Sequence, residues 1–514
     1  MEDIFSSIDD FKQWLQARSE SLPDTARFIT DRVSGIDKDI KAFTRIDAER
    51  IAERASLLEK TGEKGRLWGV PVGIKNNICI KGELTTCASR ILEGFRPPYN
   101  AHVIERLLAE GALLMGGANM DEFAFGSSCE TSCYGPTKNP LDTTRTPGGS
   151  SGGSVAAVAS GEVVAALGSD TGGSIRQPAA MCGVVAFKPT YGRVSRYGLI
   201  AFASSLDQIG PITRNVSDCA TLLEIISGYD HRDSTSVNMD VPSYTENLSK
   251  KIEGLVIGIP KEYFTSGIDE GVKCRIDEAI KVFKGLGAKT IDISLPHTKY
   301  AVSCYYIIAP AEASSNLARY DGVHYGHRSP KASRLIDMYI ATRNEGFGNE
   351  AKRRILLGTY SLSSGYYEAY YLKAQKVRTK IADDFREAFK ECDCILTPTA
   401  PTTAFKIGER MDDPLTMYLS DIFTIPANLA GLPAVSVPCG SGENDLPVGL
   451  QLMAAPFNEE VLNFANGANS SYIFSGKEMF RRLKPFVRTM RVHSTRNNLA
   501  LESAASSVTT RHSV

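Results

Sequence analysis

Two segments rich in glycine and serine contain the residues whose types and spacing are best suited to chemistry. Residues 147–154 read Pro-Gly-Gly-Ser-Ser-Gly-Gly-Ser, and residues 170–176 read Asp-Thr-Gly-Gly-Ser-Ile-Arg. Glycine allows positive φ angles and close backbone approach, so such loops can direct several N–H groups and hydroxyls at one point. A serine in that setting is a candidate nucleophile, and Ser174 stands directly after two glycines.

The first segment on its own is compatible with three functions. A phosphate-binding loop is one, but the Walker pattern requires a lysine that is absent here. Residues 148–152 satisfy the weak G-x-S-x-G pattern of a nucleophile elbow, and a Gly/Ser run is also typical of a flexible linker. The second segment follows a predicted strand at 163–167, so the two segments bracket a strand, which argues against linkers. Backbone N–H groups in such a turn can stabilise a developing oxyanion.

A serine nucleophile needs a base, and the usual base is histidine. None of the seven histidines lies in a glycine-rich or strand-end setting like those of the serines. A lysine can replace histidine where burial removes its charge, because desolvation lowers its pKa from about 10.4 by several units. Lys75 ends the apolar run 69–74, where an exposed lysine is unusual. A lysine that merely ends a strand and reaches solvent is the commoner case, so the residue itself leaves both roles open.

Taken together, the three segments resemble the amidase signature family. The similarity covers the lysine after Val-Pro-Val-Gly-Ile, both Gly/Ser segments with their serine spacing, and residues 182–190. The resemblance implies that Ser174 is the acyl-forming nucleophile. It implies that Ser150, held by a cis peptide bond, relays protons, and that a neutral Lys75 is the ultimate base. The implied oxyanion-hole donors are the backbone N–H groups of Thr171, Gly172 and Gly173.

Other segments resemble one branch of that family, the A subunits of tRNA-dependent amidotransferases. These segments are residues 120–126, 191–200, 204–211 and 353–367. In that branch the A subunit hydrolyses glutamine, a B subunit uses the ammonia and ATP to amidate Glu-tRNA(Gln) or Asp-tRNA(Asn), and a small C subunit wraps both. The resemblance therefore implies a heterotrimer in which charged tRNA, ATP and Mg are bound by the B subunit. It implies neither a cofactor nor a metal on this chain.

Glutamine is a zwitterion, so its site needs a cation for the α-carboxylate and an anion for the α-ammonium group. The resemblance assigns these roles to Arg354 and Asp421. A bidentate contact between guanidinium and carboxylate is what such recognition favours. Taken alone, Arg354 would more often be a solvated helix residue and Asp421 a helix cap. Two other functions stay open: a stand-alone amidase that acts on another amide, and a catalytically silent scaffold in a larger assembly.

The elements that must position these residues alternate between apolar runs and amphipathic helices. Short apolar runs occur between residues 66 and 453, which predicts an α/β core. The resemblance implies a single large α/β/α sandwich with a central mixed, mostly parallel sheet. We expect an N-terminal helical segment at 1–62 packed on a catalytic domain at 63–465. The basic and polar tail at 466–514 departs from the family and is expected to be disordered.

Composition excludes several classes of protein. The 514 residues carry a net charge of −1, so no overall field attracts nucleic acid or anionic membranes. The spacing of the eleven cysteines matches neither a zinc framework nor a disulfide scaffold and favours reduced thiols. The acidic N-terminus lacks the features of a secretory signal, and no apolar run approaches the roughly 20 residues of a membrane span. We therefore expect a soluble, cytoplasmic protein with no membrane partner.

Overall fold

The computed structural model describes residues 4–62, 64–249, 252–264, 267–331 and 334–462. Ten strands form one sheet in the order β2-β1-β3-β5-β4-β9-β10-β8-β6-β7. The strands are β1 Pro71–Lys75, β2 Leu113–Ala118, β3 Ala165–Asp170, β4 Val185–Lys188, β5 Gln208–Thr213, β6 Val256–Pro260, β7 Lys289–Ile293, β8 Cys394–Pro398, β9 Ala434–Ser441 and β10 Pro447–Ala454. The α-helices are α1 Ile8–Gln16, α2 Leu22–Ile40, α3 Ala48–Thr61, α4 His102–Ala109, α5 Gly152–Ala159, α6 Arg176–Cys182, α7 Val216–Ile226, α8 Glu270–Gly285, α9 Ala301–Asn316, α10 Leu335–Gly346, α11 Asn349–Ser361, α12 Lys373–Ala388, α13 Pro414–Leu419 and α14 Ile425–Leu429.

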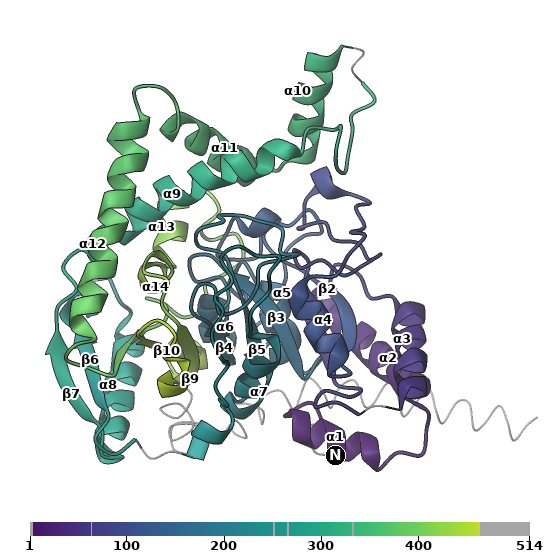
Figure 1. Ribbon diagram of the computed structural model, residues 1–514, viewed down its shortest axis with the longest axis horizontal. Helices are drawn as coiled ribbons and strands as arrows, with labels where there is room; N and C mark the ends of the chain where they lie inside the picture. Colours follow the sequence, from purple (N-terminus) through teal and green to yellow (C-terminus); the bar gives the residue numbers. More distant parts are fainter. Residues whose placement is uncertain (1–3, 63, 250–251, 265–266, 332–333, 463–514) are drawn as a thin grey trace, which may run out of the picture. The chain divides into compact units, whose positions relative to one another are not determined.

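Apolar cores cover both faces of the sheet. In β8, Cys394 and Leu396 belong to one buried cluster, whereas Ile395 between them belongs to another. Neighbouring residues of β10 divide in the same way, with Leu452 in the first cluster and Met453 in the second. Because successive side chains of a strand point to opposite faces, the two clusters lie on opposite sides of the sheet. The predicted α/β/α sandwich is therefore confirmed (Figure 1).

The sheet is mixed, as expected, but the expectation that it is mostly parallel is wrong. Four of its strand pairings are parallel and five are antiparallel among the described residues. The antiparallel pairings fill the middle of the sheet, from β3 to β8. One cause is the short connection 442–446, which joins β9 to β10, because a short loop can join only antiparallel neighbours.

Strand β5 was not among the strands expected from the sequence. It reads Gln-Ile-Gly-Pro-Ile-Thr and pairs with β3 along its whole length. Gly210 and Pro211 interrupt its apolar pattern, and both residue types are depleted in strands. Gly210 is required by packing, since a Cβ there would lie 1.9 Å from the carbonyl oxygen of Phe187.

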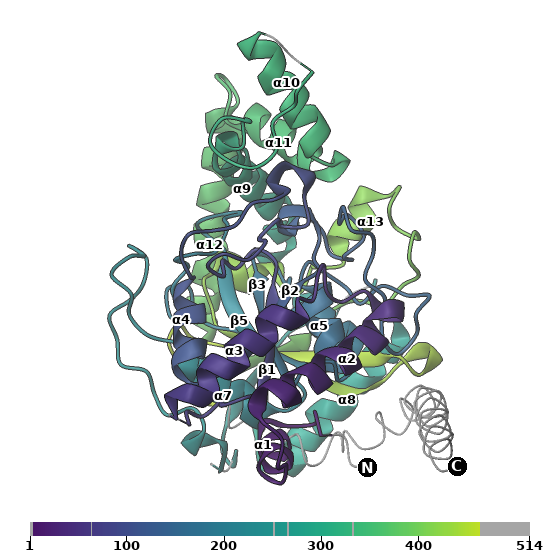
Figure 2. The ribbon, with the colours of Figure 1, turned by 90° about the vertical axis from the view of Figure 1, so that its right-hand side faces the viewer.

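The N-terminal helices start at clear capping residues. The side chains of Ser21 and Asp47 accept N–H groups in the first turns of α2 and α3, which stabilises both helix starts. Helix α2 packs on α3, and α3 lies beside the edge strand β2. Further along the chain, α9 packs against α11 and α12, and Figures 1 and 2 both show α9, α10 and α11 above the strands.

The remaining expectations concern the tail, the cysteines, membrane spans and metal sites. The tail at 466–514 lies outside the described residues. All eleven cysteines are free thiols. No helix in the described ranges combines the length and apolar character needed to cross a bilayer. The described part of the chain also holds no group of three or more His, Cys, Asp or Glu side chains arranged to hold a metal ion.

Candidate active site

Parallel strands β1 and β3 bring the first two components of the site together. The strands are neighbours in the sheet, with Ile74 paired to Leu167, so their carboxyl ends meet at one edge. Lys75 is the last residue of β1, and Ser169 and Asp170 end β3. Ligands of α/β sheets bind at such carboxyl ends. The loop after β3 carries Ser174, and the loop before α5 carries Ser150.

Lys75 contacts two serines inside the protein. Its Nζ lies 2.8 Å from Ser150 Oγ, 2.9 Å from Ser169 Oγ and 3.2 Å from the carbonyl oxygen of Ser169. The side chain is completely buried. Burial lowers the pKa of Lys75 to about 7, although nearby carboxylates, Asp121 foremost, counteract the shift. A neutral lysine is therefore accessible near neutral pH, and its lone pair can accept the proton of Ser150.

Two residues that the sequence did not single out orient this lysine. Asn77 Nδ2 donates to Ser169 Oγ at 2.9 Å. A neutral lysine has two N–H bonds and one lone pair. The Ser169 carbonyl can only accept, and its hydroxyl oxygen has two lone pairs. Both N–H bonds of Lys75 can thus point to Ser169, which leaves the lone pair for Ser150. Nothing in the sequence distinguishes Ser169 and Asn77 from ordinary polar residues near strand ends.

Ser150 and Ser174 lie on loops that are joined through the backbone. The peptide bond between Gly149 and Ser150 is cis, as the family resemblance implies. The N–H of Ser151 donates to the carbonyl oxygen of Ser174 at 3.0 Å. Ser150 is fully buried, whereas Ser174 keeps 6% of its surface exposed. No hydrogen bond of Ser174 Oγ is present within the described residues, so this hydroxyl is available to a substrate.

The turn between β3 and Ser174 has a fixed conformation. Gly173 has a φ of +138°, and a Cβ there would lie 2.1 Å from Thr424 Oγ1, so only glycine fits. The N–H of Gly173 donates to Asp170 Oδ1 at 2.8 Å. For the N–H groups of Thr171 and Gly172, no acceptor is found in the described part of the chain. These two are therefore the better placed of the three expected oxyanion donors.

A buried ion pair braces the same turn. Arg176 Nε lies 2.9 Å from Asp170 Oδ2, its Nη2 lies 3.0 Å from Oδ1, and neither side chain is exposed. Asn428 Nδ2 also donates to Asp170, at 2.9 Å. Burial alone would raise the pKa of Asp170, but the Arg176 guanidinium and these hydrogen bonds hold it at about 2. Asp170 thus stays ionised and holds the backbone that presents Ser174.

The substitution Arg176→Met is expected to lower the free energy of unfolding by about 3–5 kcal/mol, because it leaves the Asp170 carboxylate buried and unpaired. Urea unfolding of both proteins measures the change. Arg334 is a suitable control, since it forms an exposed ion pair with Asp337, and Arg334→Met should cost less than about 1 kcal/mol. A loss of stability in Arg176→Met no larger than that of the control would contradict the assignment.

Arg354 projects from α11 into a cage of aromatic rings. Only 2% of its surface is exposed, and its Nε donates to Glu350 Oε1 at 2.8 Å. Four ring centroids lie 5.2–5.7 Å from its guanidinium carbon, those of Phe125, Phe202, Tyr306 and Tyr418. Such contacts stabilise a desolvated cation. The structure therefore keeps this guanidinium inside the protein in an ion pair with Glu350. Its Nη1 and Nη2 have no acceptor among the described residues and are left for a ligand.

Asp421 lies beside the turn that carries Ser174. Ser127 Oγ donates to its Oδ2, whereas its buried Oδ1 has no hydrogen-bond partner in the described residues. That oxygen would lie 3.2 Å from a Cβ on Gly173. Burial raises the pKa of Asp421 to about 7, against the lowering effect of the Ser127 hydrogen bond. An arriving cation would find this oxygen unpaired.

Tyr305 lies between the turn and the aromatic cage around Arg354. A Cβ on Gly172 would lie 2.8 Å from Tyr305 Cζ, and the next residue, Tyr306, stacks against Tyr418 in the cage around Arg354. Arg354 and Asp421 form no ion pair with each other in the described residues. The structure thus places a cation and an anion separately around the nucleophile loop.

Known proteins resemble this chain over most of its length. The family profile described as amidase matches residues 24–462. The A subunit of glutamyl-tRNA(Gln) amidotransferase from Caldanaerobacter subterraneus is 56% identical over 481 residues, covering 93% of this chain and 98% of that protein. The A subunit of the same enzyme from Syntrophus aciditrophicus is 60% identical over 431 residues, covering 83% of this chain and 89% of that protein.

Solved structures give the same result. The A subunit of the Thermotoga maritima glutamyl-tRNA(Gln) amidotransferase superposes with a TM-score of 0.72 at 49% identity, over 87% of this chain and 90% of that one. The peptide amidase from Stenotrophomonas maltophilia superposes with a TM-score of 0.77 at 28% identity, over 91% of this chain and 97% of that one. These similarities confirm the resemblance found in the sequence.

Proposed function

Because this chain belongs to the amidase family, we propose that it hydrolyses glutamine as the A subunit of a glutamyl-tRNA(Gln) amidotransferase. The contact that carries the chemistry is the one between buried Lys75 Nζ and Ser150 Oγ, at 2.8 Å. The identity of 56% over nearly the full length of one such relative supports the choice of substrate and assembly.

In the proposed reaction, the Lys75 lone pair accepts the proton of Ser150, and Ser150 Oγ accepts that of Ser174. Ser174 Oγ then attacks the carboxamide carbon of glutamine, and the N–H groups of Thr171 and Gly172 stabilise the oxyanion. Catalytic hydrogen bonds are often long before substrate binds, so the contact between Ser150 and Ser174 forms with glutamine present. The same relay returns a proton to the departing ammonia, and water then hydrolyses the glutamyl ester to glutamate.

Glutamine is held at its two charged ends. Arg354 binds the α-carboxylate, and the unpartnered Oδ1 of Asp421 accepts the α-ammonium group. The ammonium charge lowers the raised pKa of Asp421, so binding itself keeps this carboxylate ionised. A neutral amide without these charges gains from neither contact, which favours glutamine over the substrates of a stand-alone amidase.

Asp421→Asn is expected to raise KM for glutamine about 30- to 5,000-fold, because removing one partner of a buried charge pair costs about 2–5 kcal/mol. The change in kcat should be much smaller, since Asp421 does not touch the reacting carbonyl. Steady-state hydrolysis by the assembled complex measures both. Asp337→Asn, at an exposed position of α10, should leave KM unchanged. If KM of Asp421→Asn stays within twofold of the wild-type value, Asp421 does not bind the ammonium group.

The proposal includes partners. We expect B and C subunits in a cytoplasmic heterotrimer, with ATP, Mg and charged tRNA bound through the B subunit. Co-purification from the native cell should recover both subunits, and their addition should strongly raise glutamine hydrolysis by this chain. Full glutaminase activity without them, or a preference for a neutral amide over glutamine, would favour a stand-alone amidase.

A further inference from the structure

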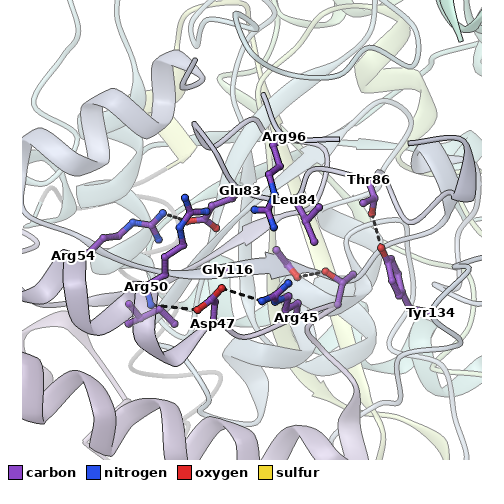
Figure 3. A pocket seen from close by; sticks show the side chains of 13 residues that line it. Arg45, Asp47, Arg50, Arg54, Glu83, Leu84, Thr86, Arg96, Gly116 and Tyr134 are labelled. Carbon is purple, nitrogen blue, oxygen red and sulfur yellow. Dashed lines mark hydrogen bonds and ion pairs between the residues drawn. The ribbon is translucent and has the colours of Figure 1, made fainter. Parts of the chain in front are cut away.

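A cavity lined by four arginines lies at the N-terminal helices, and none of the residues proposed to act on glutamine lines it. Its volume is about 120 Å³, and its walls come from the start of α3, the loops 44–47 and 83–86, and the two glycines of β2. Figure 3 shows Arg50 and Arg54 reaching along one side toward Glu83, with Arg96 entering from another direction. We call it the arginine cavity, after Arg45, Arg50, Arg54 and Arg96.

The two carboxylates of the cavity are already engaged. Asp47 Oδ2 pairs with Arg45 Nη2 at 3.2 Å, and its Oδ1 accepts the backbone N–H of Arg50 at 3.3 Å. Glu83 forms an ion pair with Arg54. Each carboxylate thus neutralises one guanidinium group, which leaves the charges of Arg50 and Arg96 unbalanced.

These two remaining side chains converge on one oxygen. Nη1 of Arg50 and Nη1 of Arg96 donate to the carbonyl oxygen of Gly82, at 2.6 and 2.8 Å. Neither forms an ion pair with a carboxylate in the described part of the chain. Two like charges held at one acceptor repel each other, and the repulsion is larger where water is partly excluded. Burial lowers the pKa of neighbouring Arg54 to about 10, and the charge of Arg50 adds to that shift.

We propose that the arginine cavity binds a phosphate dianion, either inorganic phosphate or a terminal phosphate monoester. A phosphoryl group carries about −1.5 to −2 charges at pH 7, which matches the two guanidinium groups without a carboxylate. A carboxylate carries one charge and balances only half of them. Guanidinium groups also bind phosphate oxygens through paired N–H donors. The volume is several times the roughly 10–15 Å³ that one water needs, so a group of several atoms fits.

The test is thermal unfolding of the full chain in increasing inorganic phosphate, with sodium chloride at equal ionic strength as the reference. Phosphate should raise Tm in a saturable way, because a ligand that binds only the folded state stabilises it. Glycerol 1-phosphate distinguishes the two sources, since a monoester site should respond to it at lower concentration than to inorganic phosphate. Acetate should have no effect. A response to acetate equal to that to phosphate, or none to either phosphate compound, would overturn the proposal.

Variants assign the effect to the cavity. Arg50→Met and Arg96→Met should each weaken the apparent phosphate affinity at least tenfold. Arg96 is exposed, so Arg96→Met carries the test if Arg50→Met does not fold. Arg66→Met is the matched control: it removes a surface cation that pairs with Glu110 and Glu224 outside the cavity, and it should keep the phosphate response. An unchanged response in Arg96→Met would place the phosphate elsewhere and refute the assignment.

Discussion

Replacing Ser174 by alanine is expected to lower kcat for glutamine hydrolysis on the order of 10⁵- to 10⁶-fold. The hydroxyl is the only group that we assign to bond formation with the substrate, and loss of a serine nucleophile elsewhere has effects of this size. The variant should fold normally, because Ser174 Oγ makes no hydrogen bond within the described residues. Hydrolysis by the assembled complex, with mass spectrometry of the glutamyl adduct, measures both rate and intermediate.

Ser154 provides the matched control for this experiment. It belongs to the same Gly/Ser segment as Ser150, but its Oγ donates to the carbonyl oxygen of Leu167 at 3.0 Å and faces the core. Ser154→Ala should keep kcat within about tenfold and should still form the adduct. An adduct that persists in Ser174→Ala would show that another residue is the nucleophile.

The second large effect is expected at the base. Lys75→Met should lower kcat about 10³- to 10⁴-fold, within the range that a general base contributes. Lys188 offers a rare comparison, because it is also buried with its pKa lowered to about 7 by burial. Its Nζ, however, donates to the carbonyl oxygens of Pro189 and Leu432 and, within the described residues, to no serine. Lys188→Met should therefore keep kcat within a few-fold of the wild-type value.

The pH dependence separates the two lysines further. A protonated Lys75 has no lone pair, so wild-type kcat should rise with pH through about 7 and level off above it. Asp421 also has a pKa near 7 in the free protein, but bound ammonium lowers it, so its titration affects kcat/KM rather than kcat. The inflection in kcat should persist in Lys188→Met and be absent in Lys75→Met. An inflection that survives in Lys75→Met would assign the base to another residue.

The parts of this site that could be predicted from the sequence are those that depend only on residues close together in the chain. Ser174 and Ser150 stand in glycine-rich segments and Lys75 ends an apolar run, which makes them candidates, and the family resemblance assigns their roles. The strands and helices that carry them also follow from local apolar patterns. Strand β5 was missed because Gly210 and Pro211 interrupt its apolar pattern. Its position in the sheet depends on pairing with β3 and β4, which lie elsewhere in the chain.

The sequence by itself thus determined the identity of the three candidate catalytic residues, the α/β class and the family. Only the tertiary structure decided how these residues are arranged and what surrounds them. The burial that lowers the pKa of Lys75 exists only once β1 lies beside β3. The Ser169 contact that orients its lone pair needs the same pairing. The unpartnered oxygen of Asp421 and the aromatic cage of Arg354 are likewise assembled from segments far apart in the chain. The pKa of a group, and whether a polar atom has a hydrogen-bond partner, depend on the groups around it. Tertiary packing determines which groups those are.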